Sequence, residues 1–419
     1  MKRNKFIFYI IPFTIFLDIF YIFIPSNVLG FESPLAIVKA IVLILYFIIL
    51  VLKGKIFYSK DVITIFLFAF YVLFLVMLSS NFIMSLRGSL TAIIPILMYA
   101  IARSEIKDFN DIKLLNERVV LAIYLLVLNM IVSNYFKIGI SDYTMKGDYR
   151  AGSLQDSYNV FTYILLVIPL VIGTISSKKK RVIVFILSII LFILLLLTMK
   201  RIAIFGFFFG YSIYFLFDKN RTKKIKYILT AFIFFIILIN IFWDLLVFRF
   251  DARANKGAFQ ENFYEKEYRY YETYFVWKDI LSFNNINRSL FGREPFNSAG
   301  TYGGESSYFF GNRVLHVDYN KIAYTTGLVG LFLYLLLFWH IFLKFRKAKK
   351  YLLKEKFFLV NELIATFYAL FFTSFFTSIA GQMQHIAFRN ILFIYLGSII
   401  NMLLKTKNLK YEHENLNNW

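Results

Sequence analysis

The chain has 419 residues, of which 59% are hydrophobic and 52 are phenylalanine. Soluble domains hold closer to half apolar residues, so this composition excludes an ordinary soluble protein and predicts a polytopic membrane protein. The formal net charge of +22 suggests a nucleic-acid partner, but its distribution along the chain argues against one, and the absence of cysteine excludes disulfides and thiolate metal sites.

Twelve apolar runs predict membrane-crossing helices, because a helix of roughly 20 apolar residues spans a hydrocarbon core of about 30 Å. The first run follows the basic residues MKRNK without a small-residue cleavage site after it, which predicts a retained helix rather than a removed signal peptide. The sequence thus predicts an all-α fold with spans near residues 6–23, 35–52, 62–79, 89–102, 119–136, 158–175, 182–198, 202–217, 227–248, 321–343, 357–379 and 391–404.

Lysine sets the predicted orientation of these spans. Of 31 lysines, 23 fall in alternate loops and the tail, which the positive-inside rule assigns to the cytoplasm. Both termini are then cytoplasmic. The predicted organisation is nine spans in residues 1–248, a large outer loop in 249–320, three spans in 321–404 and a cytoplasmic tail in 405–419.

Arginine has the opposite distribution, since 10 of the 16 arginines fall in predicted outer segments. Membrane insertion treats both residues as cations, so this bias points to the guanidinium group, whose planar donors bind phosphate or carboxylate in bidentate fashion. Pairing with outer acids or lipid head groups is the alternative for any single arginine. The ten are Arg87, Arg150, Arg201, Arg249, Arg253, Arg269, Arg288, Arg293, Arg313 and Arg389.

Two short outer segments carry candidate functional residues. In YRAGSLQDSYNV, Arg150 and Gly152 precede a predicted span, and in LTMKRIAIFG a tight turn places Lys200 and Arg201 on the outer side. Outward cations oppose insertion, so the tight turn favours an anionic partner. For the first segment, a turn that anchors the chain at the membrane is an equal alternative.

The large outer loop contains a predicted amphipathic helix near residues 268–281, which is expected to lie at the membrane surface. Its sequence surrounds Arg269 with aromatic side chains, among them Tyr271, Tyr274 and Trp277. Aromatic rings stack on the apolar faces of sugars, which favours glycan binding, while a tyrosine-rich helix that dips into the membrane interface is the alternative. The segment NRSLFGREPFNSAGTYGGESS that follows is predicted to be loop.

His316 and Asp318 lie just before the tenth predicted span. Histidine exchanges protons near neutral pH, so this position is a candidate acid–base site, although a lone histidine is more often structural. Gly327 and Gly330 thin one face of the helix below it and predict close approach by a neighbour or a lipid. The sequence has no Walker loop, nucleophile elbow or HExxH motif.

In order, spacing and sidedness, these segments resemble the O-antigen polymerase and O-antigen ligase superfamily of bacterial polytopic enzymes. Two departures stand out: Val317 follows His316 where the family often has asparagine, and the turn reads TMKR where a serine commonly stands two residues before the arginine. The residues that carry the resemblance are Arg150, Gly152, Asn159, Arg201, Arg269, Trp277, Gly292, His316, Gly327 and Gly330.

The resemblance implies a glycosyltransferase of the bacterial inner membrane that acts in lipopolysaccharide or other polysaccharide biosynthesis. The implied reaction is metal-independent, cofactor-free, inverting transfer at the periplasmic face, next to the large periplasmic loop. Its donor is a glycan on undecaprenyl pyrophosphate, and its acceptor is another lipid-linked repeat unit. Membrane lipid and a chain-length regulator protein are further expected partners, whereas nucleic acid is not.

Under this resemblance Arg150, Arg201 and Arg269 are expected to bind the pyrophosphates, and His316 is expected to act on the acceptor hydroxyl as base or orienting group. Substrate binding is expected from Arg249, Arg253, Tyr271, Tyr274, Trp277, Arg313 and Asp318. The alternatives are a ligase that transfers glycan onto lipid A core, a capsule polymerase, and a flippase for the same lipid-linked oligosaccharide. Few charged residues lie within spans, which argues against the flippase; they are chiefly Asp18, Lys39, Asp244 and Glu362.

Overall fold

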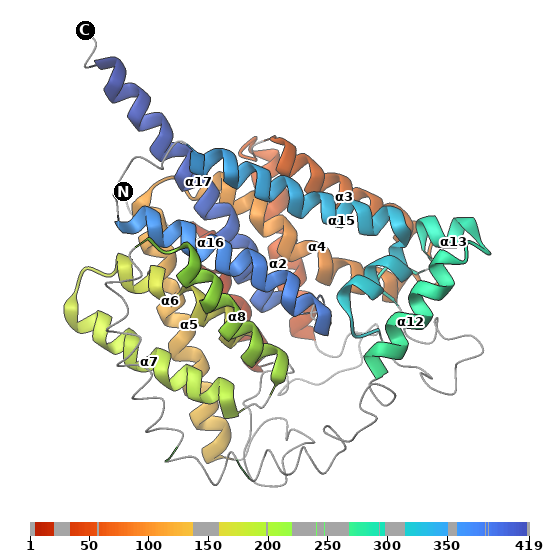
Figure 1. Cartoon of the computed structure of the whole chain (residues 1–419), viewed down its shortest axis with the longest axis horizontal. Helices are drawn as coiled ribbons and strands as arrows, with labels where there is room; N and C mark the ends of the chain where they lie inside the picture. Colours follow the sequence, from red (N-terminus) through yellow and green to blue (C-terminus); the bar gives the residue numbers. More distant parts are fainter. Residues whose placement is uncertain are drawn as a thin grey trace.

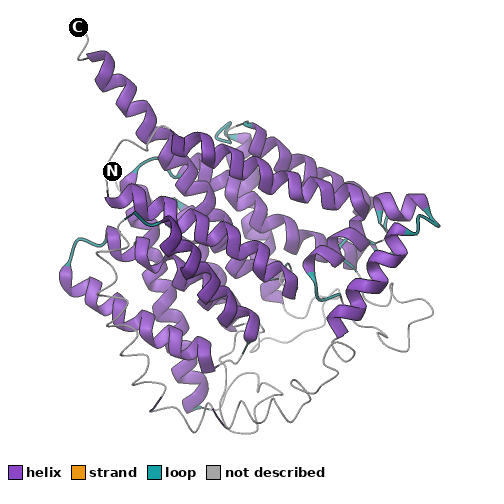
Figure 2. Ribbon diagram, viewed as in Figure 1, coloured by secondary structure: helices purple, strands orange, loops and turns teal. Residues whose placement is uncertain are grey.

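The computed structural model is a bundle of helices (Figure 1). It describes residues 5–20, 34–56, 58–136, 159–197, 200–219, 240, 247, 268–292, 294–297, 315–350, 358–381, 383 and 385–416. Every regular element in these ranges is helical, and Figure 2 shows only helices and the loops that join them. The predicted all-α fold is therefore confirmed over the part of the chain that the structure describes.

The helices are named in chain order. They are η1 (Phe6–Tyr9), α1 (Ile10–Phe20), α2 (Pro34–Leu52), α3 (Lys60–Met77), α4 (Phe82–Glu105), α5 (Phe109–Tyr135), α6 (Asn159–Thr174), α7 (Lys178–Leu197), α8 (Arg201–Phe217), α12 (Tyr268–Leu281), α13 (Ile286–Phe291), α15 (Asp318–Lys350), α16 (Phe358–Thr377), η5 (Ser378–Ala380) and α17 (Ile386–Leu416).

Seven of these helices are long and apolar enough to cross a membrane, namely α2, α3, α4, α5, α15, α16 and α17. The shorter apolar helices η1–α1, α6 and α8 accompany them. The chain is therefore a polytopic helical membrane protein. The predicted span at 227–248 lies outside the described residues, apart from two isolated positions.

Helices α4 and α5 begin well before the spans predicted at 89–102 and 119–136. Each start is fixed by a polar cap: the Asn81 side chain accepts a hydrogen bond from the N–H of Met84 at 3.4 Å, and Asp108 accepts one from the N–H of Asp111 at 3.0 Å. Hydropathy marks only the apolar middle of a helix, whereas capping side chains decide where it begins. The polar stretch predicted as a loop between these spans is consequently mostly helix.

Helix α17 occupies the centre of the bundle and α2 its rim. In the span Ile386–Lys405 an 18-residue window is wholly buried inside the protein, whereas only 22% of such a window in Pro34–Leu52 is buried. Close contact of α17 with α4 depends on Gly397, because a Cβ atom there would lie 2.6 Å from the carbonyl oxygen of Tyr99. Small residues allow such approach in membranes, where no hydrophobic force drives helices together.

Charged residues within the spans are paired or hydrogen-bonded. Lys39 of α2 forms an ion pair with Asp18 of α1, and buried Glu362 of α16 accepts a hydrogen bond from the Tyr214 hydroxyl of α8. These contacts match the expectation that ionisable groups in a membrane find partners. Asp244, the fourth such residue in the sequence, lies outside the described residues.

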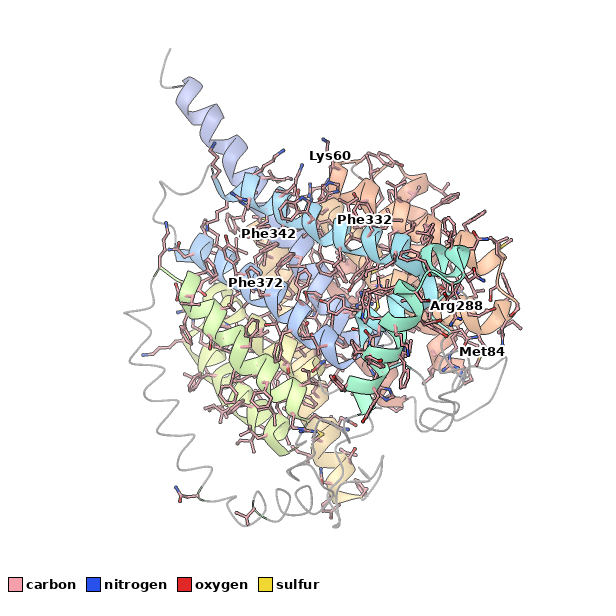
Figure 3. The ribbon with its side chains drawn as sticks, turned by 45° about the vertical axis from the view of Figure 1, so that its right-hand side comes forward. Lys60, Met84, Arg288, Phe332, Phe342 and Phe372 are labelled. Atoms are coloured by element: carbon pink, nitrogen blue, oxygen red, sulfur yellow. The ribbon has the colours of Figure 1, made fainter. Side chains whose placement is uncertain are left out.

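The bundle has two ends with different contents. At one end, which we call the His316 end, α15 begins beside the extra helices α12 and α13. At the other, the Asp61 end, α3 begins and α4 finishes. Figure 3 shows Arg288 and Met84 at the first end and Lys60 at the second. Side chains along the flanks are apolar, and Phe332 is 63% exposed there, as expected of a lipid-facing surface.

Candidate functional site

His316 lies on the short segment that enters α15, between α12 and the turn that joins α16 to α17. From the turn, Gly381 packs directly on the backbone carbonyl of His316, and any Cβ at this glycine would collide with that oxygen. Gly381 has a φ of +75°, a conformation that also favours glycine. The backbone of His316 is thus fixed, while its side chain remains 42% exposed.

From the other side, Glu272 of α12 holds the same segment. Its carboxylate is fully buried and accepts hydrogen bonds from the backbone N–H groups of His316 at 3.0 Å and Val317 at 2.9 Å. One of its oxygens, Oε2, lies 3.9 Å from Nδ1 of His316. A buried carboxylate is stabilised by such donors and by the positive end of the helix that follows.

Sequence reasoning missed Glu272. It stands in a helix of mixed charge and aromatic residues, where a solvated acid is the ordinary expectation. Its partners lie 44 and 45 residues further along the chain. The sequence carries no signal for a contact of that kind, which only the docking of α12 on α15 creates.

Helix α12 docks on α15 through apolar and polar contacts together. Val276 and Ile280 pack with Ala323 in a small buried cluster. The indole Nε1 of Trp277 donates to Oδ1 of Asn320 at 3.1 Å. Trp277 therefore serves this packing, whereas Tyr274, at 52% exposure, presents its ring outward from the helix.

Asp318 opens the first turn of α15 and is buried. Its Oδ1 accepts a hydrogen bond from the backbone N–H of Met383 at 2.9 Å, which ties α15 to the turn before α17. Lys321, one turn further on, is also buried and interacts electrostatically with both Asp318 and Glu272. The start of α15 therefore gathers two carboxylates and a buried ammonium around the entry segment.

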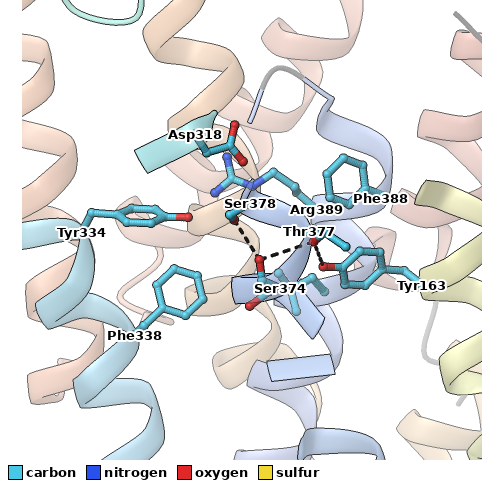
Figure 4. A pocket seen from close by; sticks show the side chains of 10 residues that line it. Tyr163, Asp318, Tyr334, Phe338, Ser374, Thr377, Ser378, Phe388 and Arg389 are labelled. Carbon is cyan, nitrogen blue, oxygen red and sulfur yellow. Dashed lines mark hydrogen bonds between the residues drawn. The ribbon is translucent and has the colours of Figure 1, made fainter. Parts of the chain in front are cut away.

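Asp318 also lines a small cavity beneath this turn (Figure 4). The cavity has a volume of about 10 Å³, roughly the space that one water molecule needs. Figure 4 shows the Asp318 carboxylate close to the guanidinium of Arg389. The other lining residues are Tyr163, Tyr334, Phe338, Ser374, Thr377, Ser378, Phe388 and Leu392.

Arg389 is the cation of this cavity. It is one of the ten arginines in the predicted outer segments, and at 4% exposure it is buried within the protein. Nη1 donates to the carbonyl of Met383 at 3.4 Å, and Nη2 has no hydrogen-bond partner among the described residues. The polar lining and the small volume suit one bound water molecule rather than a phosphate group.

Arg201 begins α8 at the same end of the bundle. Its turn is tied to α6, because the Thr162 hydroxyl donates to the carbonyl of Ala203 at 2.8 Å. The adjacent Tyr163 shares a hydrogen bond of 2.9 Å with the Thr377 hydroxyl, and both line the cavity. The structure therefore brings the start of α8 to the group of elements that surrounds His316.

The remaining predicted site residues are placed in part. Tyr271 is half-buried on α12. Arg269 lies in the first turn of α12, three residues before Glu272, with its side chain outside the described residues. Arg150, Arg249, Arg253 and Arg313 also lie outside the described residues.

The prediction of close approach at Gly327 is confirmed, and the neighbour that approaches is the backbone of α13. Gly327 has a φ of +71° and interrupts α15, and a Cβ there would collide with the carbonyl of Leu290 in α13. Gly292, at +76°, packs in the same way on the backbone of Thr325. The second predicted glycine, Gly330, lies beside Thr326 of its own helix and the ring of Tyr71.

The predicted loop after α12 begins as a helix, since its first residues belong to α13 (Ile286–Phe291), and the part that follows is anchored to the bundle. Glu294 accepts hydrogen bonds from the side chains of Ser79, Ser80 and Ser85 at the α3–α4 turn. Partial burial favours its neutral form, but these donors outweigh that effect and lower the pKa of Glu294. Next to it, the carbonyl of Phe296 packs on Gly88, where a Cβ would lie 2.7 Å away.

No protein-family model matches the chain, and a search of curated proteins found no match. The site must therefore be judged by its chemistry. A half-exposed imidazole stands on a fixed backbone, with a carboxylate behind it and an arginine-bearing turn at the same end. This arrangement is suited to acid–base chemistry on a substrate that carries negative charge.

Proposed function

We propose that the protein is a membrane glycosyltransferase, namely an O-antigen or capsular polysaccharide polymerase. It joins oligosaccharide repeat units carried on undecaprenyl pyrophosphate at the periplasmic face of the bacterial inner membrane. The observation that carries the proposal is the placement of His316, with an exposed imidazole on a rigid segment where a membrane-spanning helix begins.

The position suits a lipid-linked substrate. The carrier's phosphates emerge where the hydrocarbon core ends, so a group that acts on the attached sugar must stand at the end of a span. Arg201 stands at that level at the start of α8, and Arg269 lies on α12 beside the same segment. Guanidinium groups stabilise a pyrophosphate leaving group through bidentate hydrogen bonds and charge.

In the proposed reaction a hydroxyl of the acceptor sugar attacks the anomeric carbon of the donor sugar. The hydroxyl proton passes to the imidazole of His316 as the new carbon–oxygen bond forms. The bond between the anomeric carbon and the phosphate oxygen breaks, and undecaprenyl pyrophosphate leaves as an anion. Attack opposite the leaving group inverts the anomeric configuration.

A ligase that transfers glycan to lipid A core would use the same donor chemistry with a different acceptor. A flippase is the second candidate of another class, favoured by the interruption of α15 at Gly327, since transporters place broken helices around their substrates. That interruption, however, is filled by the backbone of α13, and it therefore offers no open coordination site at the glycine.

Deleting the gene in its native host separates these functions. A polymerase deletion leaves a single repeat unit on the surface lipid, whereas loss of a ligase or flippase leaves none. A surface lipid without any repeat unit would overturn the polymerase assignment.

Replacement of His316 by alanine tests the site. Removing a general base typically lowers a rate by about 10²- to 10⁴-fold, so polymer should disappear while the protein inserts at the normal level. His340→Gln is the matched control, because this histidine lies far from α12. Its Nδ1 shares a hydrogen bond of 2.7 Å with the Thr64 hydroxyl. Unchanged chain length and yield with His316→Ala would refute the assignment.

A further inference from the structure

Glu272 does more at this site than join two helices. Its carboxylate accepts from two successive backbone N–H groups, and its Oε1 also lies 3.5 Å from the side-chain amide of Asn320. These hydrogen bonds are sufficient to join α12 to the segment that enters α15. Yet Oε2 also faces Nδ1 of His316, 3.9 Å away, on the side of the ring that points to α12.

Hydrogen-bond donors surround this carboxylate. Three N–H donors from His316, Val317 and Asn320 point at it, and a neutral carboxylic acid would place its own proton among donors. It also lies at the positive end of α15, in whose first turns the buried side chain of Lys321 stands. A buried and ionised acid next to an imidazole acts on that ring through charge and through orientation.

Building on the proposed function, we propose that Glu272 is the positioning residue of His316, holding the imidazole with Nδ1 toward α12 and Nε2 toward the acceptor hydroxyl. The proton removed from that hydroxyl then arrives at Nε2. The resulting imidazolium has its other N–H directed at the carboxylate, which remains ionised throughout. This assigns His316 as the base rather than only an orienting group.

Other charges around His316 do not replace this carboxylate. Asp318 and Lys321 on α15, Arg389 on α17 and His385 in the preceding turn belong to the elements packed against the segment. Asp318 is committed to the N–H of Met383 and faces the cavity. On α12 and α13, Asp279 and Arg288 form their own ion pair. The Glu272 carboxylate lies within ion-pair distance of the His316 ring, with Oε2 3.9 Å from Nδ1.

The decisive measurement is NMR of labelled histidine in the purified, full-length protein in lipid nanodiscs. The chain has four histidines, so single replacement of each one assigns the signals. In the wild-type protein the proton of neutral His316 should reside on Nδ1. In Glu272→Gln the imidazole should titrate at lower pH, because the charge that stabilises its protonated form is gone.

Thr273→Val is the matched control. It removes the hydrogen bond of 2.8 Å between Asn320 and the Thr273 hydroxyl, and so loosens the same helix contact without changing charge. A merely structural role for Glu272 predicts equal effects of both variants on the His316 titration. An equal effect, or a wild-type proton on Nε2, would overturn the inference.

Activity supplies a second readout, with lipid-linked repeat units purified from the deletion strain. Glu272→Gln should lower kcat by roughly 10- to 100-fold, the usual effect of removing the partner of a working imidazole. The acid limb of the pH profile should move to lower pH. Should Glu272→Gln fail to insert, Glu272→Asp keeps the charge, and its His316 should titrate close to the wild-type value.

The two proposals fail in different ways. If His316→Ala keeps full polymerase activity while the Glu272→Gln titration shifts as expected, His316 is not the base and only the contact between the two side chains stands. If the deletion strain carries no repeat unit on its surface lipid, the proposed function is wrong whatever the titration shows. If His316→Ala is inactive but Glu272→Gln leaves the titration and the pH profile unchanged, the pairing is wrong and the function stands.

Discussion

The two ends of the bundle hold their buried carboxylates in different ways. At the Asp61 end, Asp61 is buried and accepts hydrogen bonds from Arg103 at 2.5 Å, Tyr99 at 2.6 Å and Ser59 at 2.6 Å. At the His316 end, the carboxylates of Glu272 and Asp318 are held by backbone N–H groups. Each end also holds a buried guanidinium nitrogen without a hydrogen-bond partner among the described residues, Nε of Arg103 and Nη2 of Arg389. The Asp61–Arg103 pair is a structural lock between α3 and α4, whereas the backbone-held carboxylates at the other end lie beside a half-exposed imidazole.

The two ends should therefore contribute differently to the free energy of unfolding. Breaking a buried ion pair by removing one partner is strongly destabilising, because the other charge is left uncompensated in a medium of low polarity. A half-exposed side chain such as His316 has no comparable role in stability. We therefore expect replacements at the Asp61 end to affect folding and replacements at the His316 end to affect turnover.

The largest effect on stability is expected from Asp61→Ala. It should lower the free energy of unfolding by about 3–5 kcal/mol, measured by reversible unfolding in detergent or bicelles. The fraction of the variant that remains folded should synthesise polysaccharide at the normal rate. A double replacement, Asp61→Leu with Arg103→Met, should recover most of the loss, because it removes both charges. A normal stability for Asp61→Ala alone would contradict the lock.

Gly381→Ala tests the His316 end through the backbone. A non-glycine residue in the left-handed region costs about 1–2 kcal/mol, and the new Cβ must also displace the carbonyl of His316. The loss of activity should be larger than the decrease in the folded fraction of the variant, and the remaining activity should be close to that of His316→Ala. Gly54→Ala is the control, since Gly54 has a similar φ of +61° with no atom within 4 Å of the new Cβ.

The smallest effect is expected at Glu294. Its pKa is lowered in the folded protein, so its hydrogen bonds to the serines stabilise the fold above the ordinary value of 4.5 and are lost as the pH falls through the lowered one. Glu294→Gln should flatten the acid side of the stability curve and slightly lower the stability near pH 7, where the ionised carboxylate contributes in the wild-type protein. A steeper acid limb in this variant would contradict the sign of the shift.

Sequence reasoning found the features that depend on local pattern. Apolar runs predicted the helices, and Gly327 predicted a close approach. It did not find contacts set by packing at a distance, such as Asp61 with Arg103 or Glu272 with His316, because residues about 40 positions apart leave no periodic signal. Arg389 shows the same limit, since a terminal position near a span looks identical in sequence whether the side chain faces water or a cavity.

The central place of α17 has a consequence for biogenesis. All the other described helices precede α17 in the chain, so the ribosome synthesises the surrounding helices before the central one. Until α17 is inserted and Gly397 packs on Tyr99, the face of α4 that will contact α17 is not yet covered by protein. Lipid or an insertion factor must then occupy this face. A chain that stops before α17 should consequently be recognised by membrane proteases as unfinished.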